Sequence, residues 1–346
     1  MQIGVGLDPT LGLTFEQQRD LAREAARLKY TSMWTPAGLG IDAFQVCAQW
    51  WGASSDVVAG GLTTGISVVP VAHWTAPQLA ATAGTVGLLT GGRFILGIGS
   101  GSIHDENQRQ AYSLPAYPPI GMMRDYLVTV RDLLAGQAVE YSGPAVTLHG
   151  ARLGFRPPHV PVYLGALGPQ MVKLAGRQAD GVLLNWCSPE QIAWSRELVA
   201  EGARAAGRDP VSVQVVEYIR VCVDEDEEAA RRALTRAILG YALARPGADR
   251  RLSYRGHFAR MGFDEALSAL EERRDRGASQ EEIIDAFPTA LLKQVGYYGG
   301  ASGAAEAFKR LAQGLDLAIV RVVSVRPGPE AALATMRACR PELTGN

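Results

Sequence analysis

Short apolar runs alternate with amphipathic stretches along most of the chain. Runs rich in β-branched and aromatic residues predict buried strands, and apolar residues three or four positions apart predict helices. We predict eight strands, and they cover residues 3–7, 31–34, 65–69, 94–98, 162–164, 182–184, 211–223 and 317–323. Helices are predicted between them, at residues 14–28, 42–51, 77–89, 122–134, 169–176, 188 onward, 224 onward and 304–311.

Regular alternation of strand and helix predicts an α/β fold. Eight such units favour a (β/α)8 TIM barrel that forms one domain over residues 1–346, with a doubly wound sheet as the alternative. Two interruptions are expected. Residues 139–148 are predicted to form a hairpin, and residues 245–294 are too long for a loop. We interpret residues 245–294 as an insertion, with a helix near 265–276, that forms a lid or one wall of a pocket.

The stretch from Pro161 to Trp186 predicts one βαβ unit with a short glycine-containing loop between strand and helix. A small loop that opens onto a helix N-terminus offers free backbone N–H groups and the positive end of the helix dipole. A phosphate or carboxylate would fit there. Taken alone, the loop is better explained as an ordinary tight βα turn.

Three alternating glycines, Gly97, Gly99 and Gly101, follow the strand at 94–98. This spacing lets a backbone or ligand come close to the strand end. It resembles a dinucleotide-binding fingerprint, but the acidic residue that such a fingerprint needs about twenty residues later is absent.

Composition narrows the classes of partner. A formal net charge of −1 argues against nucleic acid, which needs a basic surplus. The first residues lack a basic region and a cleavage site, so no signal peptide is expected. The four cysteines are far apart and form no CxxC motif, which indicates reduced thiols in a cytoplasmic protein and no metal site.

No Asp, Glu, Lys or Arg occurs between Asp56 and Arg93, although this stretch contains a predicted outer helix. A barrel helix normally presents a charged or polar face to water. Pro70, Pro77 and the glycines interrupt any continuous apolar helix, so a membrane span is excluded. We therefore predict a homodimer through the helices after strands two and three, with a cover from the same chain, such as the insertion, as the alternative.

The segments GRFILGIGSG, PVYLGALGPQMVKLAG and ADGVLLNW together resemble the bacterial luciferase-like superfamily. The match is to its branch that uses the deazaflavin coenzyme F420, which includes methylenetetrahydromethanopterin reductases and deazaflavin-dependent glucose-6-phosphate dehydrogenases. FMN-using members tend to carry a serine in the loop where this chain has Ala166-Leu167-Gly168-Pro169. The resemblance therefore implies F420 as the cofactor, with FMN as the alternative.

The resemblance also implies cofactor-binding positions. A non-prolyl cis peptide at Ser67–Val68 should press on the coenzyme ring, and the loop after the fifth strand should hold the phosphate. Around the same face the ends of other strands should meet the coenzyme. The full expected set is Thr35, Ser67, Val68, Ser100, Gly101, Ala166, Leu167, Gly168, Gln170, Met171 and Asn185.

The catalytic positions of the two relatives do not carry over cleanly. Thr35-Pro36 stands where the sugar-phosphate dehydrogenases have Asp-His, and Ser102 stands where both relatives have an acidic residue. His73, His104 and Ser102 are the candidates that remain for hydrogen bonding or proton transfer, although structural roles explain them as well. The resemblance implies hydride transfer between the deazaflavin and a small substrate. An FMN-dependent monooxygenase and a non-catalytic coenzyme-binding protein remain the alternatives.

Overall fold

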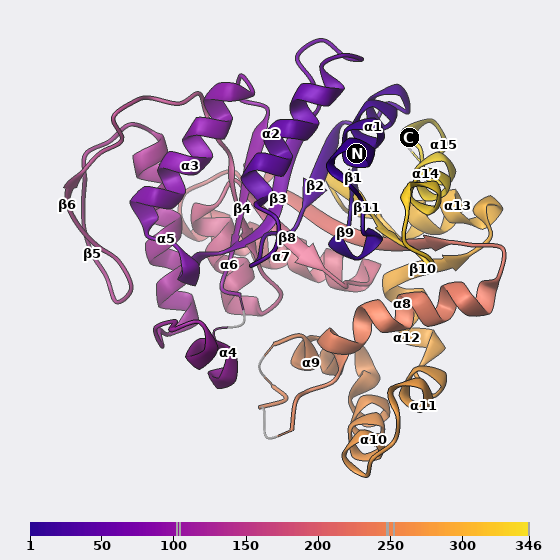
Figure 1. Cartoon of the computed structure of the whole chain (residues 1–346). Helices are drawn as coiled ribbons and strands as arrows, with labels where there is room; N and C mark the ends of the chain where they lie inside the picture. Colours follow the sequence, from indigo (N-terminus) through magenta and orange to yellow (C-terminus); the bar gives the residue numbers. More distant parts are fainter. Residues whose placement is uncertain (102, 104, 247–248, 252, 345–346) are drawn as a thin grey trace.

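The computed structural model describes residues 1–101, 103, 105–246, 249–251 and 253–344 of the 346-residue chain. Eight parallel strands close into a barrel (Figure 1), because β9 pairs with both β8 and β11, and β11 pairs with β1. The strands are β1 (Gln2–Gly6), β2 (Ser32–Thr35), β3 (Thr63–Pro70), β4 (Phe94–Gly99), β7 (Val162–Gly165), β8 (Gly181–Asn185), β9 (Gln214–Val223) and β11 (Leu317–Val323). The predicted (β/α)8 TIM barrel is confirmed.

Helices surround the strands. They are α1 (Phe15–Arg27), α2 (Ala43–Ser54), α3 (Ala76–Leu89), α4 (Glu106–Ala111), α5 (Pro119–Leu134), α6 (Pro169–Gln178), α7 (Pro189–Ala205), α8 (Glu227–Ala242), α13 (Ala301–Leu311), α14 (Pro329–Ala338) and α15 (Pro341–Thr344). A capping box is present at α1, where Thr14 and Gln17 each bond the other's backbone N–H. No helix in the described part of the chain combines the length and apolar character that crossing a membrane requires.

The predicted hairpin is present as β5 (Val139–Ser142) and β6 (Thr147–Ala151). Strand β9 begins later than predicted, because Asp209 caps a 3-10 turn over Pro210–Ser212 that occupies its first positions. One strand was missed. β10 (Gly296–Gly299) pairs with residues 220–223 of β9, on the part of that strand that extends beyond its pairing with β8.

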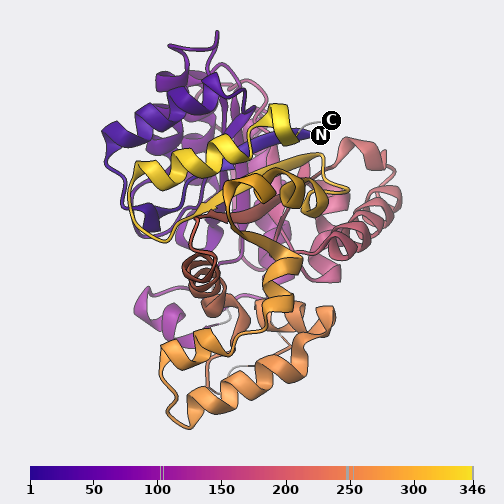
Figure 2. The ribbon, with the colours of Figure 1, turned by 90° about the vertical axis from the view of Figure 1, so that its right-hand side faces the viewer.

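Four helices fill the long segment between α8 and β10. They are α9 (Ser253–Phe258), α10 (Asp264–Asp275), α11 (Gln280–Asp285) and α12 (Thr289–Val295), and a π-helical turn at Ala259–Phe263 joins the first two. Figure 2 shows them as a separate layer at one end of the barrel. They share a core with Trp186, which follows β8, and with Ile238 of α8.

The segment without charges is partly covered by its own chain. Ala80 and Ala83 of α3 are fully buried. Helix α5 packs on α3, and a Cβ added at Gly84 would lie 3.2 Å from Phe155. The intrachain cover is therefore α5 with the residues before β7, rather than the insertion that the sequence suggested. Leu88 and Leu89 remain 50% and 54% exposed.

Candidate functional site

The floor of the candidate site is an irregular point in β3. The peptide bond between Ser67 and Val68 is cis, as predicted, and the pairing of β3 with β4 shifts between Ile66 and Val69. The Val68 side chain lies over the ends of two neighbouring strands. A Cβ at Gly99 would come within 2.5 Å of Val68 Cγ2, and one at Gly165 within 3.0 Å of Val68 Cγ1. The glycines at these strand ends therefore make room for Val68.

The loop after β7 lies next to this floor and is the candidate anion site. Gly168 is the N-cap of α6 and supplies no side-chain cap, whereas Thr14, Asp42 and Ser188 each accept a backbone N–H at the start of their helices. A Cβ at Gly168 would meet nothing within 4 Å. The start of α6 therefore lacks a side-chain cap and has open space beside Gly168, and this arrangement fits a phosphate.

Other predicted cofactor positions lie at neighbouring strand ends. Thr35 is nearly buried, and its hydroxyl donates to the carbonyl of Pro36 at 3.2 Å. Ser100 is half-buried and donates to the carbonyl of Gly101, which has a positive φ of 63°. Ala166 is buried, while Leu167 and Met171 are half-buried and Gln170 is exposed.

The candidate catalytic side chains are less well defined. His73 ends a short 3-10 helix after β3, is exposed, and has its ring 5.8 Å from that of Tyr112. Ser102 and His104 lie outside the described residues, so their predicted roles stay predictions. The next residue, Asp105, forms an ion pair with Arg245 and so joins the chain after β4 to the start of the insertion.

Two buried arginines lie at the mouth of the barrel, and the sequence reasoning missed one of them, Arg220. Arg321 of β11 forms an ion pair with Asp8, donates to the carbonyl of Leu7 at 2.9 Å, and lies over the Tyr218 ring. Burial alone would raise the pKa of Asp8, but Arg321 and the N–H and hydroxyl of Thr10 hold it below its usual value.

Arg220 of β9 is the second of these arginines and is only 6% exposed. Its Nη1 donates to Oδ1 of Asn185, whose Nδ2 donates to the Tyr254 hydroxyl at 2.7 Å. Asn185, predicted to contact the coenzyme, thus links β9 to the insertion. The alternation of side chains along β9 could have identified this residue, because every second residue of a strand points to the same side. It places Arg220 on the same inward face as Val216 and Tyr218.

Two titratable groups with large pKa shifts lie behind this layer. Burial raises the pKa of Glu217 to about 8, although its carboxylate accepts the backbone N–H of Cys187 at 2.6 Å. Burial lowers the pKa of His257 to about 4, and its Nε2 donates to the carbonyl of Trp186 at 2.8 Å. At neutral pH both side chains are therefore uncharged. Within the described residues, no group of three His, Cys, Asp or Glu side chains is placed to hold a metal.

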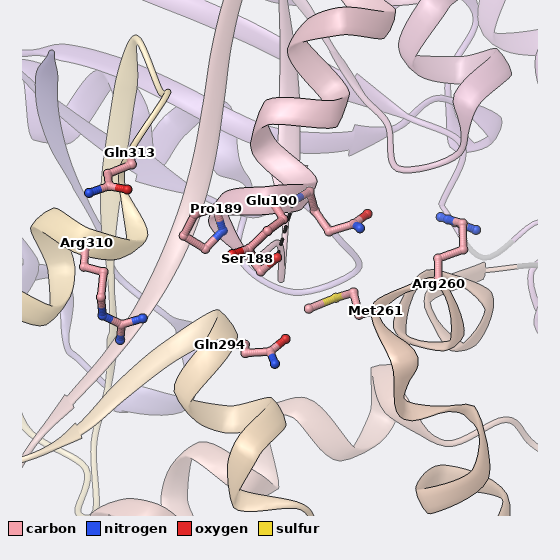
Figure 3. Close-up of a pocket in the computed structure, with 9 residues that line it drawn as sticks. Ser188, Pro189, Glu190, Arg260, Met261, Gln294, Arg310 and Gln313 are labelled. Carbon is pink, nitrogen blue, oxygen red and sulfur yellow. Dashed lines mark hydrogen bonds between the residues drawn. The ribbon is translucent and has the colours of Figure 1, made fainter.

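A separate cavity of about 480 Å³ lies beside the mouth, between the N-terminus of α7, the insertion and the C-terminal part of α13 (Figure 3). Ser188, Arg260, Gln294 and Arg310 are among its lining residues. None of the predicted coenzyme-binding residues lines it. Arg260 nevertheless connects this cavity to the loop after β7, because its Nη2 donates to the carbonyl of Leu167 at 3.2 Å.

Several known proteins resemble this chain in sequence. A 5,10-methylenetetrahydromethanopterin reductase of Archaeoglobus fulgidus is 36% identical over 169 residues, which cover 49% of this chain and 50% of the relative. An F420-dependent glucose-6-phosphate dehydrogenase of Mycolicibacterium fortuitum is 30% identical over 177 residues, covering 49% and 52%. In each case the alignment spans about half the length of the relative.

Solved structures and a family model extend the comparison to nearly the whole chain. The F420-dependent tetrahydromethanopterin reductase of Methanopyrus kandleri superposes with a TM-score of 0.76 at 20% identity, over 97% of both chains. An F420-dependent secondary alcohol dehydrogenase gives a TM-score of 0.74 at 17% identity, over 100% of this chain and 99% of that one. Both show the shared fold. The model of the luciferase-like monooxygenase family matches residues 1–316, and the chain belongs to this family.

Proposed function

We propose that this chain is an oxidoreductase that transfers a hydride between coenzyme F420 and a small organic substrate. The observation that carries the proposal is the uncapped, open N-terminus of α6 beside the Val68 floor. The helix start offers backbone N–H groups to a phosphate, and the apolar Val68 side chain beside it offers a contact to a ring. The name of one relative, an F420-dependent glucose-6-phosphate dehydrogenase, supports the choice of coenzyme.

The protein would bind and orient the coenzyme and the substrate and would exclude water from them. The bound deazaflavin would supply the hydride chemistry. Gly168, Gln170 and Met171 would hold the phosphate through their backbone. Val68 would support the ring, held in place by close contact with Gly99 and Gly165. The insertion would form one wall, because Tyr254 and Arg260 bond to Asn185 and to the loop at Leu167. His73, Ser102 and His104 remain the proposed sources of a hydrogen bond or proton to the substrate.

We expect the purified protein to bind the deazaflavin at least ten times more tightly than FMN, as measured by absorbance or fluorescence titration. A deazaflavin has carbon in place of the reactive flavin N5, so it performs hydride transfer and not oxygen chemistry. Reduced F420 should then be consumed with at least one member of a panel of enones, imines, alcohols and sugar phosphates. Tight FMN binding with oxygen-dependent turnover would establish the monooxygenase alternative. Coenzyme binding without turnover across the panel would favour a binding protein.

We also propose a cytoplasmic homodimer. The apolar surface left on α3 by its own chain includes Leu88 and Leu89, and Val57 and Val58 after α2 are also exposed. A twofold contact would bury the same patch on both subunits. Light scattering at micromolar concentration should give twice the monomer mass. The double change Leu88→Arg and Leu89→Arg should give the monomer, and it avoids the internally buried Ala80 and Ala83. A monomeric wild type contradicts the proposal.

A further inference from the structure

Arg220 faces the Val68 floor across the mouth of the barrel. The eight strands follow the order β1, β2, β3, β4, β7, β8, β9 and β11 around the ring, so β3 and β9 are four places apart and lie opposite each other. Arg220 is on the inward face of β9, near the carboxyl end of the strand. A ring resting on Val68 would therefore have its free side toward Arg220, where a substrate must approach.

The guanidinium group of Arg220 is held in a fixed orientation. Its central carbon lies 3.7 Å from the centroid of the Trp186 ring and 5.7 Å from that of Tyr241. Asn185 accepts a hydrogen bond from Nη1, and Tyr254 in turn orients Asn185. The contacts come from β8, α8 and α9, so barrel and insertion both position this one group.

Arg220 lacks the counter-charge that other buried arginines have. Arg255 is 1% exposed and pairs with Glu271 at 3.0 Å, and Arg321 is 3% exposed and pairs with Asp8. No carboxylate among the described residues pairs with Arg220. The remaining residues, 102, 104, 247–248, 252 and 345–346, include no Asp or Glu. Burial accordingly lowers the pKa of Arg220 from its usual value. A buried cation without a partner is unfavourable unless a ligand brings the opposite charge.

The unused part of the guanidinium suits a particular ligand. With respect to the described residues, Nε and Nη2 make no hydrogen bond, and neither is among the fully buried unpartnered atoms. These two nitrogens form one edge of the guanidinium, with two parallel N–H groups. That edge matches the two oxygens of a carboxylate.

We propose that Arg220 is the substrate-recognition residue of this site and that it binds a carboxylate carried by the substrate. The inference rests on the proposed function, because it assigns the face opposite the coenzyme floor to the substrate. It names a substrate class, small carboxylic acids, that is recognised by a bidentate charged pair.

The first test compares two buried arginines in the ligand-free protein. Removing an unpaired charge should not destabilise the fold, so Arg220→Met, which keeps the packing on Trp186, should change the Tm by less than about 2 °C or raise it. Arg255→Met is the matched control. It removes the buried partner of Glu271 and leaves that buried carboxylate only the half-exposed Arg250 as a counter-charge, so it should lower the Tm by about 5 °C or more. A similar loss in both variants would mean that Arg220 is structural and would overturn the proposal.

The second test uses acetate, crotonate and benzoate, each beside its amide, with the coenzyme-loaded protein. At least one acid should raise the Tm or perturb the coenzyme fluorescence at a tenfold lower concentration than its amide, and Arg220→Met should abolish this preference. Coenzyme affinity should stay within twofold of wild type. If no acid is preferred while the deazaflavin binds, the inference about Arg220 fails alone. If the wild type binds no deazaflavin, the proposed function fails first.

Discussion

Replacing Gly168 by Asp is expected to abolish coenzyme binding while leaving the fold intact. Gly168 has φ −84° and ψ 150°, which any residue adopts, and a Cβ there meets nothing within 4 Å. Asp is also a favourable N-cap, so α6 should be as stable as before or slightly more stable. The new carboxylate would accept the N–H groups that we assign to the phosphate and would repel it. We expect an affinity loss of at least about a hundredfold, or about 2.7 kcal/mol, in a fluorescence titration.

Two further substitutions at Gly168 separate the causes. Gly168→Ala adds the Cβ without charge or cap and should bind the coenzyme almost normally. Gly168→Asn adds a neutral cap that competes for the same N–H groups, so its loss should be intermediate. Wild-type affinity in the Asp variant would show that the phosphate of the coenzyme does not bind at this loop. An equal loss in all three variants would point to steric exclusion instead.

The contribution of Glu217 to stability should fall as the pH rises from about 5 to 8. Its pKa is about 8 in the folded chain against a usual 4.5. Between these values the unfolded chain loses the proton and the folded chain keeps it, so rising pH favours unfolding. At about 1.4 kcal/mol per pKa unit, this amounts to about 3 to 5 kcal/mol across the window.

Glu217→Gln removes the titration and keeps an oxygen for the Cys187 N–H. Denaturant unfolding should be measured at pH 5, 6.5 and 8. The free energy of unfolding of the variant relative to wild type should increase at each step, by about 3 to 5 kcal/mol in total. Glu272→Gln, at an exposed carboxyl, is the control and should follow wild type. A difference between Glu217→Gln and wild type that does not change with pH would show that the carboxyl is ionised in the folded state.

The barrel could be predicted because its strands are short apolar runs with clear ends. For example, β7 ends at Gly165 and α6 begins at Pro169. The residues on either side of this loop follow the hydrophobic pattern of a strand and of a helix, respectively. The strand β10 could not be predicted in the same way. It has four residues, Gly296–Gly299, and directly follows α12, and only the unusual length of β9 provides an edge for it to pair with.

The site was predicted unevenly for a related reason. The half that we assign to the coenzyme depends on backbone and glycines, which a family resemblance preserves, and the cis bond at Ser67–Val68 was predicted in this way. The half that we assign to the substrate depends on side chains from distant segments. Arg220, Trp186 and Tyr254 meet only after the barrel closes and the insertion packs on it, and no local pattern of residues connects them.

The pairing of β9 has a consequence for how this molecule could diversify. The ring of eight strands closes through the contacts of β9 with β8 and β11, and β10 pairs only with the extension of β9. Residues 243–295 therefore leave the barrel and return to it without contributing a strand to its closure. A lineage could exchange this segment and acquire a new wall for the proposed substrate site, while it inherits the proposed coenzyme site on β3, β4 and β7 unchanged.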